Sequence, residues 1–561
     1  MGSRILPLVP QAVTEFTVSD LIAAFLEGIG AETAFGVVSV HNIPVMDAIS
    51  RRNRIRLVST RGEAGAAHMA DGHARAGQRL GVLITSTGPG AANACGGLYE
   101  AWTASTPLLH ITGQSKTAHI EMGRGTTHET QNQLGMLRTV CKGAFRIRTP
   151  SEAMAVLTQA AALALTAPMG PVSIEVPADI QRSAVARPVH LDAFQLQVPP
   201  SPAPRTATLE RMAGMVRTAR RPVLWLGSGA RQAETSVRAL IDLGFACVSS
   251  WHGRGLIEED HSMSLGAMNG GGIPLIEEFY ESCDLMIVAG SRLRGHETVD
   301  FSVKLPAQRI QVDVHAAAQG RTYPCELFVQ GDVGLVLTEL CDGLGDWRPD
   351  PAFAGDVARV KERARNAFKA TLGPYSTFAE QLQPVLDDGV IFARDVTINH
   401  STWGHRLTQL HAPHTNIYPV AAGIGQGLSL AIGAALTGQR TLCMTGDGGF
   451  MLNVGELWTA IQENADLTIL VMNDAGYGVI RHIQDATGAG RRHETLVMPD
   501  LADFARTAGL PFWRVSAPED FGAALAEAVE QSGPTLVEVD MTAIGPHPPY
   551  FPYGPKAEAV D

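Results

Sequence analysis

Paired cysteines, long apolar runs and excess positive charge are all missing from this chain of 561 residues. Its 7 cysteines are scattered without a Cys-x-x-Cys pair, so we expect buried free thiols in a reducing cytoplasm. No stretch reaches membrane-spanning length without a charge or a helix breaker, and the first residues lack the apolar segment of a signal peptide. A net charge of −12 argues against a nucleic-acid partner, which would need a basic face. We expect a cytoplasmic protein that binds neither nucleic acid nor membrane.

The composition of the chain suits a globular protein with a large hydrophobic core. Apolar residues make up 45% and charged residues 18%, and the length suits about three domains. Helical and strand patterns alternate along most of the chain, which predicts an α/β protein with three doubly wound parallel-sheet domains. A proline-rich segment at 198–205 is typical of a linker. We place the domains at 14–190, 204–345 and 375–545, followed by a tail at 546–561.

The tail is rich in proline and aromatic residues, which excludes regular structure there. Two interpretations stay open for it. It is either a loose end or an aromatic flap over the mouth of a site.

Two aspartates carry the strongest functional signal. Asp447 closes one apolar strand pattern, Asp474 closes the next, and a helical pattern at 453–464 separates them. A crossover of this kind joins neighbouring parallel strands, so both carboxylates should emerge at the same carboxyl edge of a sheet. Two oxygen donors there suit Mg²⁺, and the backbone N–H groups of Gly448 and Gly449 at the helix start favour an anion. The pattern predicts a metal-bound diphosphate.

Gly446-Asp447-Gly448, followed one strand–helix–strand unit later by Asp474, resembles the signature of thiamine diphosphate enzymes. The family's usual residue at position 474 is Asn, and the extra charge of Asp should hold the cation at least as well. The resemblance implies magnesium bound by Asp447, Asp474 and the carbonyl of Gly476. It implies further that the cofactor contacts Gly446, Gly448, Gly449 and Tyr477.

Glu63 resembles the glutamate that binds N1′ of the cofactor's aminopyrimidine. It follows the strand pattern at 55–58 and stands in a run of small residues. By the resemblance, Glu63 both binds the cofactor and activates it. A carboxylate at N1′ stabilises the tautomer whose 4′-nitrogen deprotonates C2 of the thiazolium to give the nucleophilic ylid. On its own Glu63 would be an ordinary first-turn helix carboxylate.

Three other segments are similar to the same family. In 397–403, Asn399 and His400 match residues that contact the diphosphate. In 421–427, Gly423 and Ile424 match the glycine-rich turn whose bulky apolar residue keeps the cofactor bent. The run 87–93 is similar to a first-domain landmark of acetolactate synthase and its relatives. There Gly88 either allows close approach to the cofactor or makes a structural turn.

The resemblance covers essentially the whole chain, as a pyrimidine-binding, a central and a diphosphate-binding domain. Family members place the cofactor between the pyrimidine-binding domain of one subunit and the diphosphate-binding domain of another. The resemblance therefore implies a homodimer or homotetramer with active sites at the subunit interface. A glycine-containing run at 265–272 and the turn at 227–229 are only loosely similar to flavin or dinucleotide sites, so FAD is left open and not favoured.

The reaction is predicted from departures from the synthases. His296 stands where they carry an arginine for the acceptor 2-oxo acid, and Ile483 stands where they carry a tryptophan. His41 and His128 are placed as candidate catalytic proton donors, although each also fits a structural histidine. The sequence after His128 is also similar to that of 2-oxo acid decarboxylases, 2-ketoarginine decarboxylase among them.

We expect a thiamine-diphosphate- and Mg²⁺-dependent decarboxylase of a 2-oxo acid, acting through the C2 ylid and an enamine, with carboligation as a side activity. The main alternative is a carboligase of the acetolactate synthase type. A hydroxyacyl or benzoin-type lyase and a flavin-dependent oxidase are weaker alternatives. A non-catalytic scaffold would have no use for Glu63 beside the two aspartates.

Overall fold

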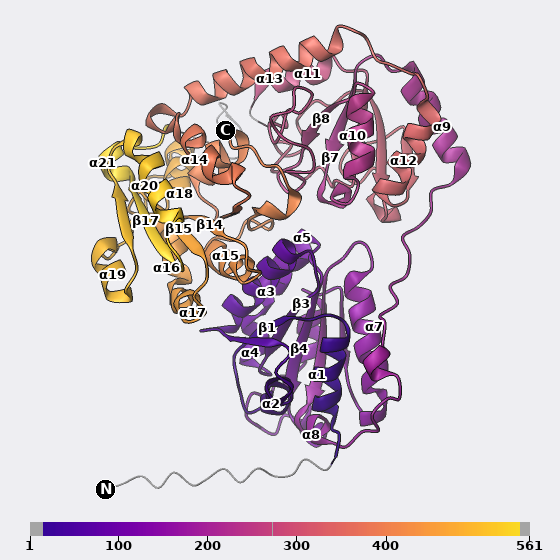
Figure 1. Ribbon diagram of the computed structural model, residues 1–561, viewed down its shortest axis with the longest axis vertical. Coiled ribbons are helices and arrows are strands. Elements are labelled where there is room, and N and C mark those ends of the chain that lie inside the picture. The colour runs from indigo at the N-terminus through magenta and orange to yellow at the C-terminus, as the bar shows by residue number, and fades with distance from the viewer. Residues whose placement is uncertain (1–14, 272, 550–561) are drawn as a thin grey trace.

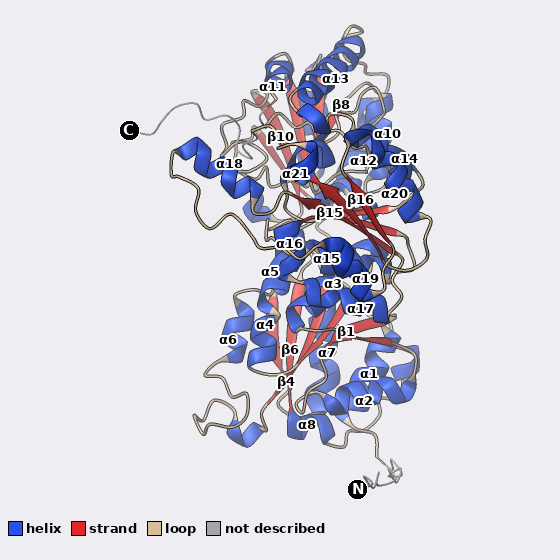
Figure 2. Cartoon of the chain, turned by 90° about the vertical axis from the view of Figure 1, so that its left-hand side faces the viewer, coloured by secondary structure: helices blue, strands red, loops and turns tan. Residues whose placement is uncertain are grey.

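Three parallel β-sheets, each flanked by helices, make up the chain in this computed structural model, which describes residues 15–271 and 273–549 (Figures 1 and 2). In Figure 1 the first sheet lies at the bottom, the central one at the upper right and the third, in orange and yellow, at the upper left. Neighbouring strands pair in parallel throughout these sheets. The prediction of three doubly wound parallel-sheet domains is confirmed.

The first sheet has six strands in the order β2-β1-β3-β4-β6-β5. Its strands are β1 Thr33–Gly36, β2 Arg56–Ser59, β3 Gly81–Thr85, β4 Leu108–Gln114, β5 Gly143–Arg146 and β6 Pro171–Pro177. Its helices are α1 Val18–Gly28, α2 Ile43–Arg52, α3 Glu63–Gly77, α4 Pro89–Asn93, α5 Cys95–Ala104, α6 Gln133–Arg138, α7 Ala153–Leu165 and α8 Ala178–Arg182. Strand β4 is buried along its whole length, as expected where helices cover both faces of a parallel sheet.

The second sheet has five strands in the order β11-β10-β9-β7-β8. Its strands are β7 Pro222–Leu226, β8 Ala246–Ser249, β9 Leu285–Ala289, β10 Gln308–Asp313 and β11 Leu327–Gln330. Its helices are α9 Thr206–Thr218, α10 Glu234–Asp242, α11 Pro274–Glu281 and α12 Val333–Leu344. The long helix α13 Phe353–Ala370 leads on to the third sheet. The linker at 198–205 contains no helix or strand.

The third sheet has six strands in the order β13-β12-β14-β15-β17-β16. Its strands are β12 Ile391–Arg394, β13 Asn416–Ile417, β14 Thr441–Gly446, β15 Leu467–Asn473, β16 Phe512–Val515 and β17 Thr535–Asp540. Its helices are α14 Phe378–Asp387, α15 Gly427–Ala435, α16 Asp447–Leu452, α17 Leu457–Gln462, α18 Gly478–Thr487, α19 Leu501–Ala508, α20 Phe521–Val529 and α21 Met541–Ile544.

The crossover between β14 and β15 differs from the single helix expected at 453–464. It is broken into α16, a 3₁₀ turn at Val454–Glu456 and α17. The break has a physical cause, because Asn453 and Glu456 bond outside the helix. The Asn453 side chain donates to the Gly425 carbonyl at 2.6 Å, and the Glu456 carboxylate accepts from the Gly62 N–H at 3.0 Å. The two strands nevertheless remain direct neighbours.

The first and third domains share one hydrophobic core, which runs from the first sheet through α3 and α15 to the third sheet. Helices α3 and α15 lie side by side in both overall views (Figures 1 and 2). Their backbones meet at glycines: a Cβ added to Gly72 would overlap the Leu430 carbonyl, and one added to Gly433 would overlap the Met69 carbonyl. Only glycine permits this approach.

Two further expectations can be compared with the fold. All seven cysteines are free, and Cys141, Cys247, Cys283 and Cys443 are buried. Within residues 15–271 and 273–549, no helix combines the length and apolar character needed to cross a bilayer. Residues 550–561 of the predicted tail lie outside the described residues.

Candidate active site

The two aspartates lie at the carboxyl ends of adjacent strands. Gly446 at the end of β14 pairs with Met472 of β15, so Asp447 and Asp474 follow at the same sheet edge. Asp447 is buried at the first position of α16, and its Oδ2 accepts the Gly476 N–H at 2.8 Å. The predicted carboxylate pair is thus brought together, and the chain returns to it at Gly476.

Burial and mutual repulsion make this pair costly to ionise. Burial raises the pKa of Asp447 to about 7, the charge of Asp474 adds to the rise, and the Gly448 and Gly476 N–H groups oppose it. Burial also raises the pKa of Asp474, while Arg481 lowers it. Arg481 lies 3.7 Å from the Asp474 carboxylate and is a member of the site that sequence patterns did not reveal. A bound cation would compensate the same charges.

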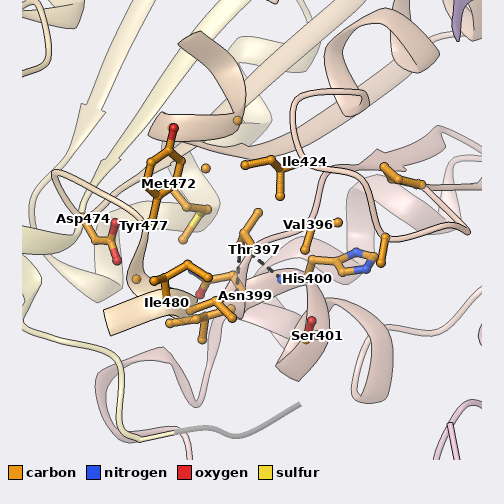
Figure 3. Close-up of a pocket in the computed structure, with 18 of the residues that line it drawn as sticks. Val396, Thr397, Asn399, His400, Ser401, Ile424, Met472, Asp474, Tyr477 and Ile480 are labelled. Atoms are coloured by element: carbon orange, nitrogen blue, oxygen red, sulfur yellow. Dashed lines mark hydrogen bonds between the residues drawn. The ribbon is translucent and has the colours of Figure 1, made fainter. Parts of the chain in front are cut away.

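A cavity of about 350 Å³ opens beside the aspartates (Figure 3). This volume falls within the range of ordinary ligand sites. Most of the residues predicted to contact cofactor or metal line it: Asn399, His400, Ile424, Gly446, Asp447, Gly448, Gly449, Asp474, Gly476 and Tyr477. Gly423 is next to the lining residue Ile424 without itself being part of the wall.

The glycine-rich turn at the cavity is held by an aspartate that sequence patterns missed. Asp395 follows β12 and accepts the N–H groups of Gly425 and Gly427 at 3.1 and 3.3 Å. Burial raises its pKa to about 6, and these N–H groups oppose the rise. Gly425 has φ of +80°, which favours glycine. The turn leaves Ile424 45% exposed at the cavity, where it can touch a ligand (Figure 3).

Asn399 and His400 line the same cavity and lie in a segment after β12. Asn399 is buried, and its Oδ1 accepts from the Trp403 indole at 2.8 Å. His400 is buried with its ring centroid 4.2 Å from that of His405, and its Nδ1 has no hydrogen-bond partner in the described chain. Burial holds the pKa of His400 well below its usual range. A buried, unpartnered ring nitrogen at a cavity wall is suited to receive a polar ligand atom.

Glu63 and Gly88 lie in a different place, at the carboxyl edge of the first sheet. Glu63 is the first residue of α3 and is half-buried, and the Asn93 amide donates to its Oε2 at 3.2 Å. Gly88 has φ of +58°, and a Cβ there would overlap the backbone carbonyl of His128. The contact with the His128 backbone and the positive φ therefore explain the glycine at position 88 as part of a structural turn.

His41 and His128 belong to this second group. Their ring centroids lie 5.1 Å apart, and the Ser86 hydroxyl is 3.2 Å from the His128 Nδ1. Burial lowers the pKa of His41, and repulsion by His128 lowers it further. The two histidines predicted as proton donors are therefore neighbours, which their separation in sequence did not reveal.

The described chain thus holds two separate half-sites. Neither Glu63, Gly88, His41 nor His128 lines the cavity beside Asp447. Each half-site contains groups that the other lacks, because one has the carboxylate pair and the other has Glu63 with the histidines.

The central domain contributes to the cavity as well. Trp251 and His296 line it, with ring centroids 5.3 Å apart. Burial, aided by the charge of Arg294, lowers the pKa of His296 to about 3, so its ring is neutral near pH 7. Ile483 from α18 also lines the cavity. His296 and Ile483, the two positions expected to differ from the synthases, therefore both line the candidate site.

The residues of the cavity fit a metal-bound diphosphate. Mg²⁺ usually takes one or two carboxylates and fills its remaining positions with phosphate and water oxygens. Asp447 and Asp474 supply such a pair in a buried setting where a cation would relieve their repulsion. The unpartnered His400 Nδ1 could donate to a phosphate oxygen, and Ile424 offers an apolar support.

Comparison with known domain families gives three matches along the chain. Residues 16–136 match the thiamine pyrophosphate enzyme N-terminal TPP binding domain. Residues 209–340 match the central domain and residues 398–539 the C-terminal TPP binding domain of the same enzymes. Together these matches span well over half of the chain.

Curated relatives align over nearly their whole length. The acetolactate synthase isozyme 1 large subunit of Escherichia coli is 28% identical, over 94% of this chain and 94% of the relative. A probable 2-ketoarginine decarboxylase of Pseudomonas aeruginosa is 29% identical over 96% of each chain. Acetolactate synthase 2 of Brassica napus, a chloroplast protein, is 27% identical over 96% of this chain and 86% of the relative.

Proposed function

Because the chain belongs to the thiamine pyrophosphate enzyme family, we propose that it is a Mg²⁺-dependent decarboxylase of a 2-oxo acid. The observation that carries the proposal is one cavity bordered by the Asp447–Asp474 pair, the glycine-rich start of α16 and the exposed Ile424. Thiamine diphosphate, when bound, supplies a carbon nucleophile and an electron sink for cleaving the bond next to a carbonyl.

In this proposal each group of the chain has a defined task. Asp447, Asp474 and the Gly476 carbonyl hold Mg²⁺, and Asn399, His400 and Tyr477 surround the diphosphate. Ile424, exposed at the cavity, would contact the bound cofactor. Glu63 orients the aminopyrimidine and holds a proton at N1′.

His296 favours decarboxylation over joining two 2-oxo acids. Its ring is neutral near pH 7 because burial and Arg294 lower its pKa to about 3. A neutral imidazole lacks the fixed positive charge and two-pronged geometry with which an arginine binds a carboxylate. An acceptor acid would therefore be held weakly at this wall.

His41 and His128 supply the complementary argument, since decarboxylation to an aldehyde requires protonation of carbon before the product is released. Their ring centroids lie 5.1 Å apart, and the charge of His128 adds to burial in lowering the pKa of His41. Protonation of one carbon needs a single proton donor, and an imidazole can serve as that donor.

A homodimer would unite the two half-sites. In that arrangement Glu63, His41 and His128 of one copy face the cavity of the other, and a homotetramer is a pair of such dimers. The assembly would act on a small-molecule 2-oxo acid in the cytoplasm, and FAD is not needed for the proposed reaction.

Product analysis tests the proposal against its main alternative. Protein loaded with thiamine diphosphate and Mg²⁺ is incubated with a panel of 2-oxo acids, and CO₂ and the organic product are followed. We expect CO₂ with an aldehyde. An acetohydroxy acid as the main product would replace this proposal by a carboligase of the acetolactate synthase type.

A further inference from the structure

The loop that carries Ile424 is held by side chains from all three domains. Residues 418–427 connect β13 to α15, and Ala422 and Gly425 within them have φ of +62° and +80°. A segment outside helix and strand must satisfy its backbone groups in other ways. The position of Ile424 at the cavity therefore depends on what binds this loop.

Glu100 of the first domain binds it most directly. This residue of α5 is fully buried, and its Oε1 accepts the Val420 N–H at 2.6 Å. Its Oε2 accepts the next N–H, that of Ala421, at 2.8 Å. Bonds from a carboxylate to two successive peptide groups fix the orientation of both, and such charge-assisted bonds are the stronger kind.

Arg75 of α3 orients Glu100 and also reaches the loop. Its Nη2 donates to the Glu100 Oε1 and its Nη1 to the Tyr418 carbonyl, each at 2.7 Å. Its Nε donates to the Asp71 carboxylate at 2.8 Å. The side chains of Asp71 and Glu100 are fully buried and that of Arg75 is 2% exposed, so these charge-assisted bonds form away from water.

Side chains of the other two domains also bind this loop. Arg294 of the central domain donates to the Val420 carbonyl at 2.7 Å. Asp395 of the third domain accepts from Gly425 and Gly427. The loop is thus fixed on both sides of Ile424, whose side chain is left 45% exposed at the cavity.

We propose that Glu100, oriented by Arg75, is a positioning residue that holds Ile424 in its exposed place at the cavity, where it would support the cofactor. The inference rests on the proposed function and deepens it. According to this inference, Glu100, which does not line the cavity, influences how readily the C2 proton of the cofactor is removed.

The test uses Glu100→Gln, which keeps the shape of the side chain but turns an N–H donor toward the loop's own donors. We expect affinity for thiamine diphosphate with Mg²⁺ to stay within about threefold of the unaltered protein. Hydrogen–deuterium exchange at C2 of the bound cofactor, followed by acid quench and NMR, should slow about tenfold or more. Amide exchange within 418–427 should become faster in the cofactor-free protein.

Glu259→Gln is the matched control. Glu259 is also buried between domains, pairs with Arg254 and accepts the Leu410 N–H at 2.9 Å, but it does not bind the loop. Its substitution should leave C2 exchange unchanged. If Glu100→Gln does not fold, Arg294→Met tests the same loop from the central domain and should slow C2 exchange.

The outcomes distinguish a failure of this inference from a failure of the proposed function. Exchange at the unaltered rate in folded Glu100→Gln would overturn the positioning role alone, as would equal slowing in Glu259→Gln. Failure of the unaltered chain to take up thiamine diphosphate would overturn the proposed function and this inference with it.

Discussion

Glu63 and Asp447 carry different parts of the proposed chemistry. Substitution of each residue should therefore affect a different property, either turnover or cofactor binding. Asp447 belongs to the buried pair whose charges a cation would balance. Glu63 is half-buried at the start of α3 in the other half-site. Loss of Asp447 should therefore remove cofactor binding, whereas loss of the Glu63 charge should remove turnover.

For Glu63→Gln we expect cofactor uptake to be retained and turnover to fall by about 100-fold or more, because an amide cannot hold the N1′ proton as a carboxylate does. Steady-state kinetics and a thiamine diphosphate titration measure the two effects. The matched control is Glu234→Gln, at the exposed first position of α10, which should change neither. Full activity of Glu63→Gln would remove this residue from the mechanism.

At the scale of elements, the contact between α3 and α15 joins the domain of Glu63 to that of Asp447. The two helices meet backbone to backbone at Gly72 and Gly433, and the core continues across the contact. This contact holds the two half-sites of one chain in a fixed relation.

We expect Gly433→Ala to destabilise the protein by about 2–3 kcal/mol, because the new methyl group would overlap the backbone of α3 at Met69. Gly214→Ala provides the control. Gly214 is exposed in α9 with no heavy atom near its missing Cβ, so alanine there should stabilise by about 0.5–1 kcal/mol. Urea unfolding of both variants measures the difference. Equal effects would show that the helices can move apart.

At the scale of the whole molecule, the separation of the half-sites predicts complementation between two inactive variants. Glu63→Gln and Asp447→Asn, each inactive alone, should regain about one quarter of the activity when co-expressed as random dimers. One site in each mixed dimer then has both intact residues. No recovery in purified mixed dimers would indicate that each chain completes its own site.

Buried histidines of the first domain should make the fold sensitive to acid. Burial lowers the pKa of His68 and His73 to about 4 and that of His110 to about 3. Below the ordinary value of 6.5 the unfolded chain binds protons that the folded chain does not, so stability falls as the pH drops from 6.5 toward 4. The loss is about 1.4 kcal/mol per pH unit for each histidine.

Unfolding midpoints measured between pH 7 and pH 4 test this dependence. His110, which lies 2.8 Å from the Thr85 hydroxyl and 2.7 Å from that of Ser173, can be replaced by Gln. We expect a shallower acid slope in His110→Gln and no change in His190→Gln, which alters an exposed histidine. An unchanged slope in the first variant would contradict the assignment.

The sequence by itself determined the features that depend on short segments. Apolar periodicity and the crossover rule were enough to place Asp447 and Asp474 at adjacent strand ends, because one strand–helix–strand unit fixes that neighbourhood. The same local patterns predicted the three parallel sheets and the linker. The resemblance to thiamine diphosphate enzymes implied that Asn399, His400 and Ile424 lie near one ligand, and these residues do line one cavity.

Only the tertiary structure decided which distant surfaces meet. It placed Glu63 apart from the Asp447 cavity, brought His41 beside His128, and carried His296 to the cavity wall. Asp395 and Glu100 gave no sequence signal, because their partners are backbone N–H groups far along the chain. Such contacts form when the apolar faces of distant helices and sheets are buried against one another. The periodicity of a single segment does not specify which other segment it packs against.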